Sequence, residues 1–331
     1  MKFALTFVFV IAVVSQASLR ANEPTKPATP AAAPVVIPPT QADVRYGEHE
    51  RQVLDFYQAK SERPTPLLFF IHGGGWVGGD KAGRTGASVK QYLAAGISVV
   101  SINYRYSWQA QLAGVKPPVK APLEDAARAL QFVRSKAQEW NIDKTRIAAS
   151  GGSAGACSSL WLAYHDDLAD PTSNDPIARE STRLLTAAVA GAQTSLDPQE
   201  LKEWTPNSRY GGHAFGFMDP NDPKTRDTRF ADFLAHRAEV LPWIKEYSPI
   251  GLVTADDPPV YLIYTNTPGL GQEQKDPTHT ANYGVKLQEK CRSVGIGCEL
   301  AYPGAPDVKH PTIDAYLIEA LTASAVKRSS R

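Results

Sequence analysis

The 331-residue sequence lacks the features that would point to several classes of function. Its 35 basic and 34 acidic residues give a formal net charge of +1, and this balance favours neither a nucleic-acid partner nor an anionic membrane surface. It contains no C-x-x-C pair and no Cys/His cluster of the kind that holds zinc. We therefore expect no nucleic-acid partner, no metal and no cofactor.

Cysteine is also scarce. The three cysteines are Cys157, Cys291 and Cys298, and an odd count excludes a fully paired disulfide framework. Cys157 is predicted to be a buried free thiol. Cys291 and Cys298 flank a predicted helix-to-strand turn. In an oxidising compartment these two could form a disulfide, and two separate buried thiols are the alternative.

The N-terminus has the composition of a targeting segment. Residues 3–14 form an apolar run that follows Lys2, precedes small residues and is too short to span a bilayer comfortably. We predict a signal peptide over residues 1–21, a periplasmic or secreted protein, and no stable membrane insertion after cleavage; a retained anchor is the alternative. Residues 22–43 are rich in Pro and Ala and predict a disordered linker. One domain is expected over residues 44–331.

Predicted strands and helices alternate along this domain. Strands are expected at 44–46, 52–57, 66–71, 97–102, from 146, at 184–190, 259–264 and 298–302, and helices at 85–95, from 122, after 153, at 282–294 and 313–321. The alternation predicts an α/β fold with a mainly parallel sheet covered on both faces. Residues 193–248 show recurrent Pro, Gly and aromatic residues without a strand pattern, and predict an insertion or lid after the sixth strand.

The most informative stretch is Gly151-Gly152-Ser153-Ala154-Gly155, which matches G-x-S-x-G between an apolar run and a helical pattern. A sharp strand-to-helix turn of this kind tolerates only small neighbours and lifts the serine hydroxyl above the sheet edge. The turn also places the serine at a helix N-terminus, which favours developing negative charge. Ser153 is therefore predicted to be a nucleophile.

A glycine loop precedes this turn by about 80 residues. His72-Gly73-Gly74-Gly75-Trp76 follows a predicted strand, and three consecutive glycines allow the backbone to expose successive N–H groups. A phosphate-binding loop is the rival interpretation. It is disfavoured because no G-K-[ST] follows.

Together, HGGGW and GGSAG resemble the α/β-hydrolase fold, and most closely its hormone-sensitive-lipase-like and feruloyl- and acetyl-esterase-like carboxylesterases. The resemblance covers residue 44 to the C-terminus. It implies that the backbone N–H groups of Ala154, Gly74 and Gly75 form an oxyanion hole. It also implies the chain order Ser, then Asp or Glu, then His.

The family order selects the base and the acid. His310 follows the last strand, where the family places its base, and we favour it over His279. Asp276 lies between the 259–264 strand and the next helix and is the favoured acid, with Asp256, Asp257 and Asp307 as rivals. We assign Trp76, Tyr104 and His279 to substrate binding.

These assignments predict an exported serine carboxylic-ester hydrolase that acts through an acyl-enzyme on small or short-acyl esters, either free or linked to polysaccharide. A carbohydrate esterase for acetyl or feruloyl groups, an amidase and a peptidase remain alternatives within the same chemistry. A non-catalytic binding protein on a hydrolase fold is the alternative from another class. The acids Glu124 and Asp125 are predicted to act through helix-end electrostatics.

Overall fold

The computed structural model describes residues 37–83 and 87–323. The predicted signal peptide and most of the predicted linker lie outside the described residues. The first strand, β1 (Gln41–Arg45), begins three residues before the predicted domain boundary at 44. It pairs with β2 (Val53–Tyr57).

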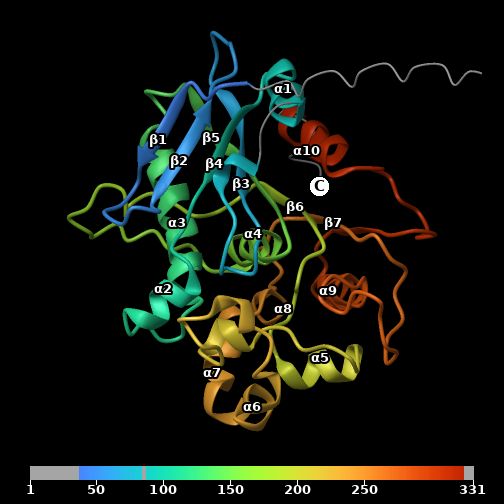
Figure 1. Ribbon diagram of the computed structural model, residues 1–331. Coiled ribbons are helices and arrows are strands. Elements are labelled where there is room, and N and C mark those ends of the chain that lie inside the picture. Colours follow the sequence, from blue (N-terminus) through green and yellow to red (C-terminus); the bar gives the residue numbers. More distant parts are fainter. Residues whose placement is uncertain (1–36, 84–86, 324–331) are drawn as a thin grey trace, which may run out of the picture. The chain divides into compact units, whose positions relative to one another are not determined.

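The strands form one eight-stranded sheet in the order β1-β2-β4-β3-β5-β6-β7-β8 (Figure 1). The remaining strands are β3 (Thr65–Ile71), β4 (Ser98–Ile102), β5 (Ile142–Gly152), β6 (Thr186–Ala190), β7 (Val260–Ile263) and β8 (Cys298–Ala301). β2 runs antiparallel to both of its neighbours, and all other pairs are parallel. The predicted α/β-hydrolase architecture is confirmed.

The parallel register brings three loops to the same edge of the sheet. Ile71, the last residue of β3, pairs with Gly151 of β5, and Gly152 pairs with Ala190, the last residue of β6. The glycine loop, the serine turn and the chain after β6 therefore leave the sheet side by side. Ligand sites of open parallel sheets form at this carboxyl edge.

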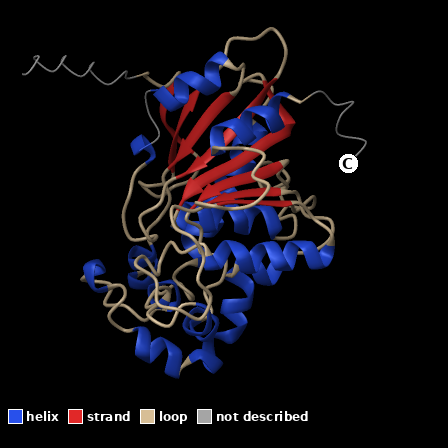
Figure 2. Cartoon of the chain, turned by 90° about the vertical axis from the view of Figure 1, so that its right-hand side faces the viewer, coloured by secondary structure: helices blue, strands red, loops and turns tan. Residues whose placement is uncertain are grey.

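Helices cover both faces of the sheet (Figure 2). On one face lie α1 (Ala87–Ala94) and α10 (Ile313–Thr322), which bury Tyr92 and Leu317 against the strands. On the other face lie α3 (Lys120–Ser135), α4 (Ala154–Tyr164) and α9 (Asn282–Val294). Every residue of α4 is buried. This fits its apolar composition, because the sheet, α3 and α8 (Pro249–Leu252) surround it.

The segment between β6 and β7 contains no strand, as its sequence pattern predicts, and the structure shows that it is helical. It contains α5 (Pro198–Trp204), α6 (Phe230–Ala235), α7 (Arg237–Tyr247) and α8, with 3₁₀ turns at Gly212–Phe215 and Pro223–Thr225. Its aromatic side chains build a small core, in which Phe215 and Phe217 each lie 5.4 Å from the ring of Phe233. The short helix α2 (Ser107–Leu112) meets this insertion through Gln111, which donates to Gly216 O and Met218 O.

Among the described residues, no helix is long and apolar enough to cross a membrane.

Candidate active site

Ser153 occupies a strained turn between β5 and α4. Its backbone has φ +54° and ψ −123°, a conformation that is costly for a residue with a Cβ. The Ser153 N–H donates to Ala190 O at 3.0 Å, which fixes the turn to the end of β6. A Cβ at Gly151 would lie 2.5 Å from Ile71 O, and one at Gly155 would overlap the same carbonyl. The motif glycines are therefore required because strand and helix approach so closely.

His279, not His310, contacts Ser153. Nε2 of His279 lies 2.9 Å from Ser153 Oγ, and Nδ1 lies 2.9 Å from Asp276 Oδ2. Asp276 Oδ1 also accepts from the backbone N–H groups of Thr278 and His279, each at 3.2 Å. The acid and the base belong to one tight turn. Ser153, His279 and Asp276 therefore form a connected triad, in which Asp276 is the acid favoured from the sequence.

The electrostatics of Asp276 favour its ionised form. Its partial burial would raise the pKa, but the hydrogen bond and charge of His279, with the two backbone N–H groups, outweigh burial and lower it. An ionised carboxylate beside Nδ1 holds the imidazole with Nε2 free to accept a proton.

The prediction that His310 is the base is wrong. Its Nδ1 lies 2.7 Å from Glu299 Oε2 and its Nε2 lies 3.1 Å from Glu319 Oε2. The ring packs edge-on against Tyr261 and Tyr316. Glu299 belongs to β8 and Glu319 to α10, so both ring nitrogens of His310 are used in joining these two elements.

The glycine loop packs directly onto the serine turn. A Cβ on Gly73 would lie 2.6 Å from Gly152 O and 3.5 Å from Ser153 Cβ. Gly74 and Gly75 have φ of +103° and +62°, and Gly74 O accepts from the N–H groups of Val77 and Gly78. Ala154 is the first residue of α4. Gly73 thus sets the glycine loop against the serine turn, and Ala154 directly follows the serine.

Trp76 and Tyr104 do not face a ligand, and their assignment to substrate binding is wrong. Both side chains are fully buried. Trp76 Nε1 donates to Ser158 Oγ at 3.0 Å, while Tyr104 OH donates to His72 O at 2.9 Å and its ring stacks on His72. They support the glycine loop from within the core. His279, the third residue so assigned, contacts the serine itself.

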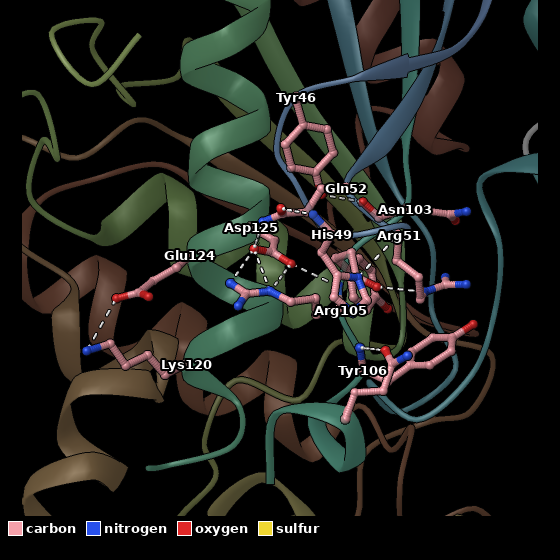
Figure 3. A network of polar contacts seen from close by, with 12 residues as sticks. Tyr46, His49, Arg51, Gln52, Asn103, Arg105, Tyr106, Lys120, Glu124 and Asp125 are labelled. Carbon is pink, nitrogen blue, oxygen red and sulfur yellow. Dashed lines mark hydrogen bonds and ion pairs between the residues drawn. The ribbon is translucent and has the colours of Figure 1, made fainter. Parts of the chain in front are cut away.

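Arg51 braces the same loop from outside, and sequence reasoning missed it (Figure 3). Its Nε donates to Tyr104 O at 2.8 Å and its Nη2 donates to Gly79 O at 3.2 Å. Its guanidinium also lies 3.8 Å from the Tyr106 ring centroid. Burial, aided by the Arg51 charge, lowers the pKa of His72 to about 4, so this loop histidine is neutral at pH 7.

Asp125 anchors the segment that carries Tyr104. Its buried carboxylate accepts from the backbone N–H and Nη2 of Arg105 and from Gln52 Nε2, at 2.7–2.9 Å (Figure 3). Asp125 therefore acts through these hydrogen bonds and not through the electrostatics of the helix end. Glu124 is exposed and pairs only loosely with Lys120, at 3.6 Å.

The rival acids lie elsewhere. Asp256 and Asp257 pair with Arg183, and Asp257 also accepts from Thr254 N. The three cysteines are free thiols. Within the described ranges, no group of three or more His, Cys, Asp and Glu side chains is arranged to hold a metal ion.

Comparisons with known proteins identify relatives of this chain. The BD-FAE family model matches residues 54–272. Esterase LipC of Mycobacterium tuberculosis is 29% identical over 233 residues, which cover 67% of this chain and 49% of LipC. Probable carboxylic ester hydrolase LipM of the same organism is 34% identical over 142 residues, 40% of this chain and 29% of LipM. The chain thus spans about half or less of the length of these curated relatives.

Solved structures share the fold. A carbohydrate esterase from gut microbiota, in truncated form, superposes with a TM-score of 0.62 at 20% identity, over 86% of this chain and 96% of that one. The acetyl ester-xyloside bifunctional hydrolase of Caldicellulosiruptor lactoaceticus gives 0.58 at 22% identity, over 80% and 86%. The predicted resemblance to α/β-hydrolase esterases is confirmed.

Proposed function

The chain belongs to the BD-FAE family, and from that premise we propose that it is a serine carboxylic-ester hydrolase. One observation carries the proposal: His279 lies at hydrogen-bond distance from both Ser153 Oγ and the Asp276 carboxylate. A nucleophile, a base and an orienting acid in one line are what acyl transfer through a serine requires.

In the first half of the reaction, His279 Nε2 takes the Ser153 proton as Oγ attacks the ester carbonyl. Asp276 holds the imidazole in the tautomer with Nδ1 protonated and stabilises the imidazolium that forms. The protonated His279 then donates this proton to the leaving alcohol, and an acyl group remains on Ser153. In the second half, water attacks the acyl-enzyme with His279 as base and releases the acid.

The tetrahedral intermediate carries a negative charge on the former carbonyl oxygen. We propose that the N–H groups of Ala154, Gly74 and Gly75 stabilise it. The positive φ of both glycines supports this role, as does the packing of the preceding residue of the loop, Gly73, against the serine turn. Loss of one such donor costs about 3 kcal/mol of transition-state stabilisation in comparable sites.

For the substrate we propose small or short-acyl esters. Acetylated or feruloylated carbohydrate is the second candidate, and it is supported by the fold shared with a carbohydrate esterase and an acetyl ester-xyloside hydrolase. The side chains of His279 and Asp276 are 36% and 46% exposed, so the site is open to a substrate with a bulky alcohol. Export remains a proposal that rests on the composition of residues 1–21.

A fluorophosphonate probe and 4-nitrophenyl acetate together test the activity. We expect the probe to label Ser153 and the ester to be hydrolysed, and Ser153→Ala to lose both. Ser61→Ala is the matched control, because Ser61 is exposed and lies far from Ser153 in the sequence. This variant should retain both the labelling and the hydrolysis. A folded wild-type chain that neither binds the probe nor hydrolyses the ester would point instead to the non-catalytic binding protein.

A further inference from the structure

The insertion reaches over the glycine loop beside the serine. A Cβ on Gly75 would overlap Nη1 of Arg226, so this guanidinium rests against the Gly75 backbone. The His213 ring contacts the same loop, 6.0 Å from the Trp76 ring. Burial, reinforced by the Arg226 charge, lowers the pKa of His213 to about 3, so His213 stays neutral beneath Arg226. Two residues of the insertion thus form a roof over the proposed oxyanion loop.

Arg226 has unused hydrogen-bond donors. Its Nε donates to Asp227 Oδ2 at 3.2 Å, and its guanidinium lies 5.9 Å from the Tyr210 ring centroid. Neither Nη makes a hydrogen bond to any described residue, and 31% of the side chain is exposed. A planar fork with free donors beside a reaction centre is suited to bind substrate oxygens.

The surroundings of Arg226 are polar but incompletely paired. Tyr210 is 1% exposed, and its hydroxyl has no hydrogen-bond partner among the described residues. Asp227 Oδ1 also lacks a hydrogen bond within the described residues, and it lies 3.7 Å from His213 Nδ1. Burial raises the pKa of Asp227, although the Arg226 charge and hydrogen bond oppose this effect. The Arg226 and Asp227 side chains are 31% and 39% exposed, so substrate hydroxyls can reach both charged groups.

We propose that Arg226 and Asp227, above the Tyr210 ring, form a subsite for the hydroxyl groups of a sugar that is the alcohol part of the ester. This inference rests on the proposed esterase function and names its substrate class. A sugar hydroxyl accepts from the guanidinium and donates to the carboxylate, so neighbouring hydroxyls satisfy both members of the pair. An anionic substrate would satisfy Arg226 but would be repelled by Asp227, and a plain aryl alcohol would use neither.

The test compares two acetyl esters that differ only in the alcohol: a monoacetylated xyloside and 4-nitrophenyl acetate. The measured quantity is the ratio of kcat/KM for the sugar ester to kcat/KM for the aryl ester. Arg226→Met should lower this ratio by about tenfold or more, the effect of losing a hydrogen bond to a charged group. Asp227→Asn should lower it less, because an amide oxygen still accepts. Arg229→Met is the matched control, since Arg229 lies three residues away, is half exposed and pairs with Asp232.

The outcomes separate the subsite from the esterase activity. Equal losses on both esters in Arg226→Met would mean that the residue only supports the glycine loop, and would overturn the subsite. An unchanged ratio, or a wild-type enzyme that cleaves the aryl ester but not the sugar ester, would overturn it as well. If Arg226→Met does not fold, Arg226→Lys, which keeps the charge but loses the planar fork, should still lower the ratio. Failure to cleave either ester would instead reject the proposed function.

Discussion

Two histidine–carboxylate pairs lie at different places in the fold, and they show what makes such a pair reactive. His279 bonds to Asp276 through Nδ1 and to Ser153 through Nε2, with 36% of its side chain exposed. His310 bonds to one carboxylate through each nitrogen, Glu299 and Glu319, with 9% exposed.

The difference is the third partner. An imidazole between a carboxylate and a hydroxyl can accept the hydroxyl proton, whereas an imidazole between two carboxylates has no hydroxyl to deprotonate. His279 is therefore placed for catalysis, and His310 joins β8 to α10. The predictions below test this contrast, from the largest expected effect to the smallest.

Replacing the carboxylate in each histidine–carboxylate pair by its amide should reveal the largest difference in kcat between the two pairs. Asp276→Asn keeps the shape but lets the amide select the wrong imidazole tautomer, and should lower kcat for 4-nitrophenyl acetate by on the order of 10⁴-fold. Glu299→Gln should leave kcat per folded enzyme unchanged, because the Glu299 carboxylate bonds to the ring and backbone of His310 and takes no part in the triad. A comparable loss of kcat in both variants would contradict the contrast.

A smaller effect is expected at Gly191, which seats the catalytic histidine. Gly191 has φ +56°, and a Cβ there would lie 3.3 Å from His279 Cβ and Cδ2. Gly191→Ala should displace the imidazole and lower kcat by about 10- to 100-fold, since small misplacements at a reaction centre are costly. Gly96→Ala is the control: Gly96 has φ +74° with open space around its Cβ position. Gly96→Ala introduces a similar backbone strain away from His279. Loss of kcat in Gly96→Ala but not in Gly191→Ala would reject the prediction.

The smallest effect concerns the stability of the His310 pair in acid. Hydrogen bonds from Lys309 and His310 lower the pKa of Glu319 to about 2, from an ordinary value of 4.5. Because the folded-state pKa is the lower one, the stabilisation is present above pH 4.5 and is lost as the pH falls toward 2. Glu319 is half exposed, so the contribution is at most about 1 kcal/mol.

Denaturant unfolding from pH 7 to pH 2 measures this contribution. Glu319→Gln should be less stable than wild type near pH 7, and the gap should close toward pH 2. Glu289→Gln removes a similarly exposed carboxylate that pairs with Lys286, and its effect should be smaller. A gap that widens on acidification would contradict the account.

Much of the fold and the nucleophile could be predicted because their signals are local. The strand, turn and helix around Ser153 lie within one stretch of sequence, and close packing there demands the glycines at 151 and 155. The eight strands follow from hydrophobic patterns that alternate along the chain, whereas the helices of the insertion carry no such signal. These features depend little on where distant segments lie.

The sequence prediction of the base is wrong because it relies on where a histidine lies relative to the last strand and not on its spacing from the acid. The resemblance implies a base after the last strand. In this chain the turn from Asp276 to His279 places the acid and the base three residues apart. That spacing was visible in the sequence. Trp76 lies next to the glycine loop in sequence but turns inward at φ +56°, and Arg226 reaches the loop from far along the chain. No sequence motif indicates that the Trp76 side chain is buried or that Arg226 contacts the glycine loop.

The most direct test of the central claim is the rate at which a fluorophosphonate labels Ser153 in two variants, His279→Gln and His310→Gln, with each rate normalised to folded protein. Labelling requires the base to activate the serine. The structure predicts that His279→Gln loses labelling, whereas His310→Gln is labelled at the wild-type rate. Rapid labelling of His279→Gln together with loss of labelling in His310→Gln would contradict it.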